Sequence, residues 1–175
     1  PSSVTFIGES AFQECSSLLK ITLPGSIKTV SQNAFQQCIS LEEVIIEDGV
    51  KTIGTGAFMH CSSLEEITLP DSVTKLGNKA FLWCLNLKTV RLSENLQVID
   101  EDVFGKTESL YELVIPESVT RIEECAFLAP STGIACFVAV LDMCRIVPSP
   151  PKQITADESG SSRSKREKRR SRGKL

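Results

Sequence analysis

The stretch of residues 64–87, LEEITLPDSVTKLGNKAFLWCLNL, contains one complete structural unit of this chain. Its first part ends in alternating apolar and polar residues, the pattern of a half-buried β-strand. Pro70 ends the strand, because proline has no backbone N–H to donate. A turn then leads to a second short apolar pair, Val73 and Leu76. From Gly77 onward, apolar residues at spacings of one, four and seven predict a helical turn or short helix packed on the core.

The same unit recurs every 23 residues without insertion or deletion. Columns of Val, Ile or Leu, of Ala, of Cys and of Pro keep the same register as a column of phenylalanine. Ser31 and Asp100 begin the predicted helical segment of their units and are expected to cap it. A strict period of this length indicates one supersecondary unit that is copied and stacked. The phenylalanines are Phe12, Phe35, Phe58, Phe81, Phe104 and Phe127.

Stacking is what makes such a unit stable. One 23-residue unit buries too little surface to offset about 1–2 kcal/mol of backbone entropy per residue. When units stack at the spacing of strands in a sheet, roughly 4.8 Å, each gains hydrogen bonds and a shared apolar interior. The sequence therefore predicts an α/β-type repeat solenoid that is mainly β.

The repeat pattern resembles a known family. L-x-x-I-x-L-P followed by V-x-x-I-G-x-x-A-F-x-x-C-x-x-L is similar to the BspA-like leucine-rich repeat, over residues 1 to about 128. That family is found in bacterial surface antigens and in surface or secreted proteins of protists and algae. The resemblance implies a right-handed leucine-rich-repeat coil with one parallel sheet on the concave face. It also implies adhesion or protein recognition at the cell surface, although a fold alone does not fix function.

Composition divides the chain into three segments. Residues 1–128 form the predicted solenoid of about five and a half 23-residue repeats, and residues 129–147 are expected to form a degenerate terminal strand or cap. Pro1 already occupies the column of prolines that follow strands, so we expect the chain to be a fragment of a longer array. The apolar run 134–141 is only eight residues long, whereas a membrane span needs about 20. We therefore predict no transmembrane segment.

Residues 148–175 are predicted to be a disordered basic tail, because they are rich in charge and poor in large apolar residues. They carry nine Lys or Arg and three acids, a net charge of +6, whereas residues 1–147 carry ten and nineteen, a net charge of −9. The tail is a candidate nuclear or membrane targeting signal. It has no aromatic residue on which bases could stack, so we expect nucleic-acid binding, if any, only through its charge. The candidate targeting residues are Lys165, Arg166, Lys168, Arg169 and Arg170.

The seven cysteines do not form a pattern typical of disulfides or metal sites. Cys15, Cys38, Cys61 and Cys84 share one column. Parallel coils would hold their Cβ atoms about 5 Å apart, too far for a bridge. We interpret them as small buried apolar residues. There is no C-x-x-C pair and only one histidine, so no metal site is predicted. A bridge among Cys125, Cys136 and Cys144 is left open.

No catalytic motif is present in the sequence. It contains no glycine-rich phosphate loop, nucleophile elbow or zincin pattern, and the paired acids recur with the repeat. His60 precedes the column cysteine Cys61 and is expected to be an exposed turn residue. We predict a protein that is not an enzyme and needs no cofactor.

The best candidates for partner binding are the outward residues of the predicted sheet. Acidic residues dominate its middle repeats, and Tyr111 is a potential aromatic anchor. We expect a monomer that binds another protein, with a basic segment as the preferred ligand. The alternative is an intracellular scaffold or adaptor, in nucleus or cytoplasm, directed by the basic tail. The candidate residues are Lys20, Glu42, Glu43, Ile45, Glu65, Glu66, Thr68, Arg91, Tyr111 and Glu112.

Overall fold

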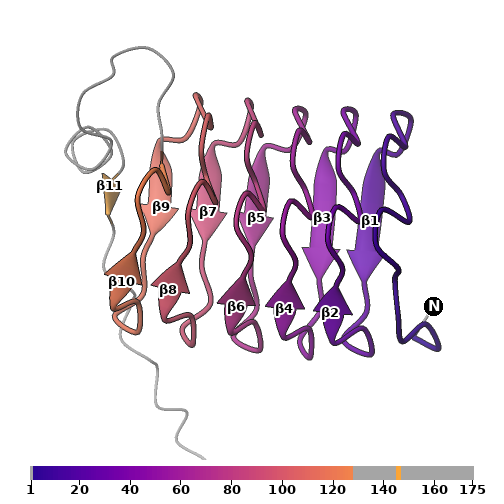
Figure 1. Ribbon diagram of the computed structural model, residues 1–175, viewed down its shortest axis with the longest axis horizontal. Coiled ribbons are helices and arrows are strands. Elements are labelled where there is room, and N and C mark those ends of the chain that lie inside the picture. Colours follow the sequence, from indigo (N-terminus) through magenta and orange to yellow (C-terminus); the bar gives the residue numbers. More distant parts are fainter. Residues whose placement is uncertain (1, 128–144, 147–175) are drawn as a thin grey trace, which may run out of the picture.

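The chain forms a stack of coils, each built from one longer and one shorter strand (Figure 1). The computed structural model describes residues 2–127, 145 and 146. The predictions for residues 128–144 and for the basic tail lie outside these residues. The longer strands are β1 (Lys20–Leu23), β3 (Glu43–Ile46), β5 (Glu66–Thr68), β7 (Thr89–Arg91) and β9 (Glu112–Val114). The shorter strands are β2 (Thr29–Val30), β4 (Thr52–Ile53), β6 (Lys75–Leu76), β8 (Val98–Ile99) and β10 (Arg121–Ile122).

The predicted parallel sheet is present as a ladder of the longer strands, here called the long-strand ladder. Its register follows the 23-residue repeat, since Lys20 lies opposite Glu43 and Thr89 opposite Glu112. A two-residue strand, β11 (Arg145–Ile146), adds to the ladder beside β9. It lies within the segment 129–147 expected to cap the solenoid, but most of that segment is outside the described residues.

A second parallel ladder, which the expectation of one sheet did not include, runs beside the first. It consists of the shorter strands and is called the short-strand ladder. The apolar pairs that follow each strand-ending turn form it, as at Val30, Ile53 and Leu76, which lie in register and are almost fully buried.

Both ladders are interrupted once in the described residues. The long-strand ladder breaks between β3 and β5, and the short-strand ladder breaks between β6 and β8. At the second break, the backbone N–H of Glu94 and the side-chain amide of Asn95 both donate to Asp71. The two breaks lie at successive coil junctions, so at each junction the other ladder remains paired.

The predicted phenylalanine stack forms the centre of the core. Neighbouring rings are parallel, with centroids 5.1–5.5 Å apart from Phe12 to Phe127. Phe35, Phe58, Phe81 and Phe104 are fully buried, whereas Phe12 is 36% exposed because only one ring covers it. The apolar columns of both ladders surround the stack.

The predicted helical segment is wrong: the described residues contain no helix, and these segments are successive turns. Two positions in each of the first five turn segments adopt a positive φ, as at Asn33 (55°) and Gln37 (59°), and this left-handed conformation interrupts any helix. Ser31 therefore caps nothing, and its hydroxyl donates to the carbonyl of Ile7 in the preceding coil. The turns form a third wall of the solenoid, called the turn side.

The turn side is held by backbone hydrogen bonds between coils. Three such bonds join the turn after β4 to the turn after β6. The backbone N–H groups of Gly56, Phe58 and His60 donate to the carbonyls of Asn78, Ala80 and Leu82, at 2.8–3.0 Å. Glycine is required where the coils approach most closely. A Cβ on Gly77 would lie 2.5 Å from the backbone nitrogen of Thr55. Glycine at this position therefore permits close stacking of the coils.

Candidate functional site

The outward side chains of the long-strand ladder form the candidate binding face. The burial pattern alternates as predicted: in β5, Ile67 is buried while Glu66 and Thr68 are exposed. Because register is fixed by the repeat, equivalent outward residues of successive coils stand side by side. One column holds Lys20, Glu43, Glu66, Thr89 and Glu112, and the column before it holds Leu19, Glu42, Glu65, Lys88 and Tyr111.

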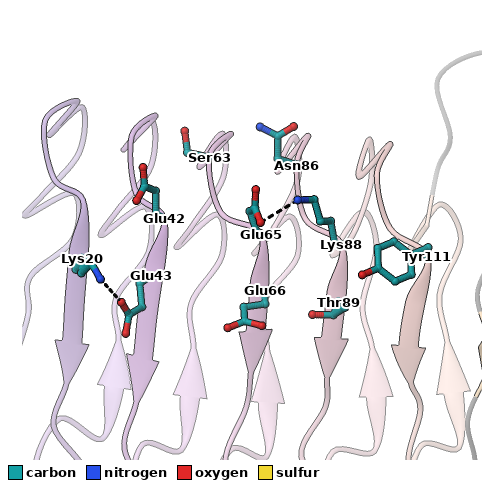
Figure 2. Close-up of a pocket in the computed structure, with 10 residues that line it drawn as sticks. All are labelled: Lys20, Glu42, Glu43, Ser63, Glu65, Glu66, Asn86, Lys88, Thr89 and Tyr111. Atoms are coloured by element: carbon teal, nitrogen blue, oxygen red, sulfur yellow. Dashed lines mark hydrogen bonds and ion pairs between the residues drawn. The ribbon is translucent and has the colours of Figure 1, made fainter.

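A hollow of about 680 Å³ lies over this face (Figure 2). It gathers six of the ten predicted residues, from β1 to the residue before β9. Lys88 and Thr89, which the strand alternation also predicts to point outward, line it in the same two columns. Sequence reasoning missed Ser63 and Asn86, which lie in the turns above the strands, where only their repeat position could have indicated them. The predicted residues that line it are Lys20, Glu42, Glu43, Glu65, Glu66 and Tyr111.

Two ion pairs cross the face between neighbouring coils (Figure 2). Lys20 Nζ lies 2.7 Å from Glu43 Oε2, and Lys88 Nζ lies 2.8 Å from Glu65 Oε2. The hydrogen bond to Glu43, followed by its charge, raises the pKa of Lys20 above 10.5. Both pairs are solvent-exposed, so each contributes little to stability but orients its side chains.

A second hollow of about 350 Å³ continues the face along β3 and β5. It contains two more predicted residues, Ile45 and Thr68, together with Glu43, Glu66 and Pro70. Ile45 is 47% exposed and gives this hollow an apolar side. Arg91 and Glu112, the remaining predicted residues, are exposed farther along the same face, on β7 and β9.

The turn side carries side chains that the sequence did not single out as candidates. His60 lies in a turn as expected, but it is half-buried rather than exposed and stacks on Trp83 with ring centroids 5.5 Å apart. Lys106 covers the other side of Trp83, with its Nζ 5.9 Å from the ring centroid. A separate acidic hollow of about 350 Å³ lies where the turn segments after β6, β8 and β10 begin. It is lined by Asn78, Asp100, Glu101, Glu123 and Glu124.

The column cysteines are free thiols, three of which are buried as predicted. Burial raises the pKa of Cys38 from 9.0 to about 11 and that of Cys84 to about 12. Each buried thiol also donates to a phenylalanine carbonyl of the preceding coil, as Cys61 does to Phe35 at 3.2 Å. Cys15 is exposed. Cys136 and Cys144 lie outside the described residues.

No group of three or more metal-ligating side chains is assembled within residues 2–127, 145 and 146. The same residues contain no helix that is long and apolar enough to cross a membrane.

Parallel 23-residue coils with a buried phenylalanine stack define a leucine-rich-repeat solenoid. Residues 1–132 match the BspA type leucine-rich repeat region in six copies, and the chain belongs to this family. The predicted family and fold class are thus confirmed. No curated protein matches the chain.

Solved structures show the same fold. A leucine-rich repeat protein from Bacteroides ovatus is 33% identical, with a TM-score of 0.70, over 73% of this chain and 33% of that one. A leucine-rich repeat protein from Eubacterium ventriosum is 26% identical, with a TM-score of 0.68, over 77% and 36%. The pneumococcal vaccine antigen PcpA is 28% identical, with a TM-score of 0.58, over 68% and 32%. This chain therefore spans about a third of these proteins.

Proposed function

We propose that this chain is a non-catalytic protein-recognition module of the adhesion or surface-antigen type, which binds another protein through the outward face of the long-strand ladder. One observation carries the proposal: the hollow on that face collects side chains from every coil between β1 and β9. A surface assembled from successive coils suits an extended protein segment better than a small molecule, since it is long, open and polar.

Two further observations support the proposal. The family fold is shared with PcpA, which is a vaccine antigen by name. The face also combines exposed carboxylates with two exposed large apolar side chains, Ile45 and Tyr111, the latter 55% exposed. Charged groups that steer a partner and aromatic groups that anchor it are common in protein interfaces. The scaffold alternative depends on the basic tail, which lies outside the described residues, and imaging of a tagged full-length protein would test it.

A peptide-display selection on the immobilised chain tests the proposal. We expect enriched peptides that bind wild type and lose binding to a Glu43→Lys/Glu66→Lys variant of the sheet face. A Glu9→Lys/Glu101→Lys variant makes the same charge change on the exposed turn side and should bind the peptides normally. Equal loss in both variants, or no enriched peptide, would argue against recognition by this face.

A further inference from the structure

The interruption of the long-strand ladder leaves two strand edges facing each other without backbone pairing. At the other long-strand junctions, one carbonyl accepts two amide hydrogen bonds from the next coil: Leu19 does so from Glu42 and Glu43, at 2.9 and 3.2 Å. Glu65 and Lys88 accept equivalent pairs at 2.7–3.3 Å. The equivalent carbonyl at the interruption is that of Glu42. Within residues 2–127 it receives neither bond, because β3 and β5 are not paired.

The separation of β3 and β5 forms a groove in the sheet face, and Figure 2 shows the wider spacing between the strands carrying Glu43 and Glu66. The smaller hollow is lined only by residues of these two strands and by Pro70. The inward residues are also less well covered there. Val44 and Ile46 are 8% and 7% exposed, whereas their equivalents in the next two coils, on β5 and β7 or directly after them, are 1–2% exposed.

Charge sets this junction apart from its neighbours. Glu42 and Glu43 stand beside Glu65 and Glu66, whereas the junctions on either side bring lysine beside glutamate. Glu43 and Glu65 are each engaged by a lysine from the outer side of the groove. Glu42 and Glu66 form no ion pair in the described part of the chain. Like charges directly opposite each other destabilise strand pairing.

We propose that the groove between β3 and β5 binds an extended basic segment of a partner protein through an inserted arginine side chain. This inference rests on the proposed function and names the ligand of the same face. The guanidinium group offers planar N–H donors in a fixed fork. Glu66 lines the groove, and Glu42 and Glu66 both line the larger hollow at its upper end. There the arginine would meet these two carboxylates, which form no ion pair in the described residues, and the Glu42 carbonyl, which accepts no backbone hydrogen bond from β5. Lysine carries its three donors on a compact ammonium without the planar fork, so it pairs with carboxylates less specifically than arginine does.

The partner segment lies along the groove, in the direction of the strands. Its alternate side chains then reach the larger hollow, at the start of the strands, and the smaller hollow beside Ile45, farther along them. A segment with arginine at every second position fits this period, because successive side chains of an extended chain point to opposite faces.

Titration of the full chain with three labelled peptides tests the assignment. The probes are Gly-Thr-Arg-Thr-Arg-Thr-Gly, its Lys counterpart and its Gln counterpart, measured by fluorescence anisotropy at low and physiological salt. We expect the Arg peptide to bind at least about fivefold more tightly than the Lys peptide, because of its paired donors. We expect the Gln peptide not to bind.

Two matched variants locate the site. Glu66→Lys places a cation in the groove and should weaken binding of the Arg peptide at least about tenfold, whereas Glu112→Lys makes the same charge change on β9 and should weaken it about twofold or less. Circular dichroism confirms folding, and Glu66→Gln replaces Glu66→Lys should the latter misfold. Equal weakening by both variants, or equal affinity for the Arg and Lys peptides, overturns the inference but leaves the proposed function intact. Absence of binding by every peptide, with no enrichment in the display selection, removes both.

The chain's own basic residues 163–172 are the competing occupant. Carbodiimide cross-linking without peptide distinguishes them, since a link between Glu66 and Lys165 or Lys168 of the same chain would place that segment in the groove. This link would overturn the assignment to a separate partner. Its absence, with peptide binding as expected, supports it.

Discussion

The junction between β1 and β3 and the junction between β3 and β5 have the same inward residue types but differ in their outward charges. At the first, Lys20 lies 2.7 Å from Glu43 and four residue pairs are in register. At the second, two glutamates face two glutamates and the strands are not paired. A strand in an ordinary sheet could slip its register to avoid such a contact. Here the 23-residue repeat fixes the register, so slipping cannot relieve the contact, and we infer that the strands separate instead.

Proline does not explain the difference. Pro70 follows β5 and removes one backbone donor, but Pro116 follows β9 in the same column and β9 remains paired with β7. The outward charges do differ between the open junction and the paired junctions on either side of it.

The same junction is closed on the turn side, where the Phe58 and Phe81 rings stack at 5.5 Å. If this stack holds the coils together while the strands separate, Phe58→Ala should have the largest effect on stability. We expect a loss of about 3–5 kcal/mol in the free energy of unfolding, because a fully buried ring leaves a cavity. Urea unfolding measures it, with Trp83→Ala as a control for an exposed aromatic. If the urea midpoint of Phe58→Ala equals that of wild type, the ring stack does not hold these coils together.

Thiol labelling tests separately whether the coils that are open at β3 and β5 remain closed on the turn side. We expect iodoacetamide at pH 8 to modify Cys15 rapidly in the native protein and Cys61 and Cys84 at least about tenfold more slowly. The buried thiols are protonated and covered, and only the thiolate reacts. Peptide mapping by mass spectrometry identifies each site. Rapid labelling of Cys84 would mean that the opening between coils extends to the turn side.

The raised thiol pKa values also predict the pH dependence of stability. Above pH 9 the unfolded chain loses thiol protons that the folded chain retains, so stability falls as pH rises. For Cys84 the loss grows from about pH 9 towards a pKa of about 12. Replacing Cys84 by Ala should flatten the alkaline part of a plot of unfolding midpoint against pH. An unchanged slope would assign the alkaline loss to other groups.

Much of this architecture follows from the sequence because each repeat column reports one environment. The phenylalanine and aliphatic columns predicted the stack and the strands, and outward positions such as Glu66 followed from alternation. The turns were predicted wrongly, because apolar spacing in a short turn segment imitates a helix. Positive φ at residues as different as Lys79 and Trp83 has no compositional signal. The open groove was also missed, although the adjacent acidic pairs at residues 42–43 and 65–66 were visible.

Lys88→Glu should place glutamate opposite glutamate at the junction of β5 and β7, as already occurs at the junction of β3 and β5. Glu65 would then face a second glutamate, and we expect the amides of residues 88 and 89 to exchange up to about fivefold faster. This corresponds to a like-charge penalty of about 0.2–1 kcal/mol. Hydrogen exchange measured by NMR reports the two amides, which donate to the Glu65 carbonyl in wild type. Lys88→Gln is the control, and equal exchange in both variants would remove charge as the cause of strand separation.

Glu66→Lys should produce the converse and smallest effect, by giving β3 and β5 the lysine–glutamate contact that β1 and β3 already have. We expect the amides of residues 65 and 66 to gain the hydrogen bonds to the Glu42 carbonyl and to exchange up to about fivefold more slowly. Glu112→Lys on β9 is the matched control. Raising the ionic strength of the wild type should move exchange in the same direction, since salt screens exposed charges over roughly 8 Å at 0.15 M. If neither change slows the exchange of these amides, backbone geometry separates β3 from β5, and the charge pattern is not the cause.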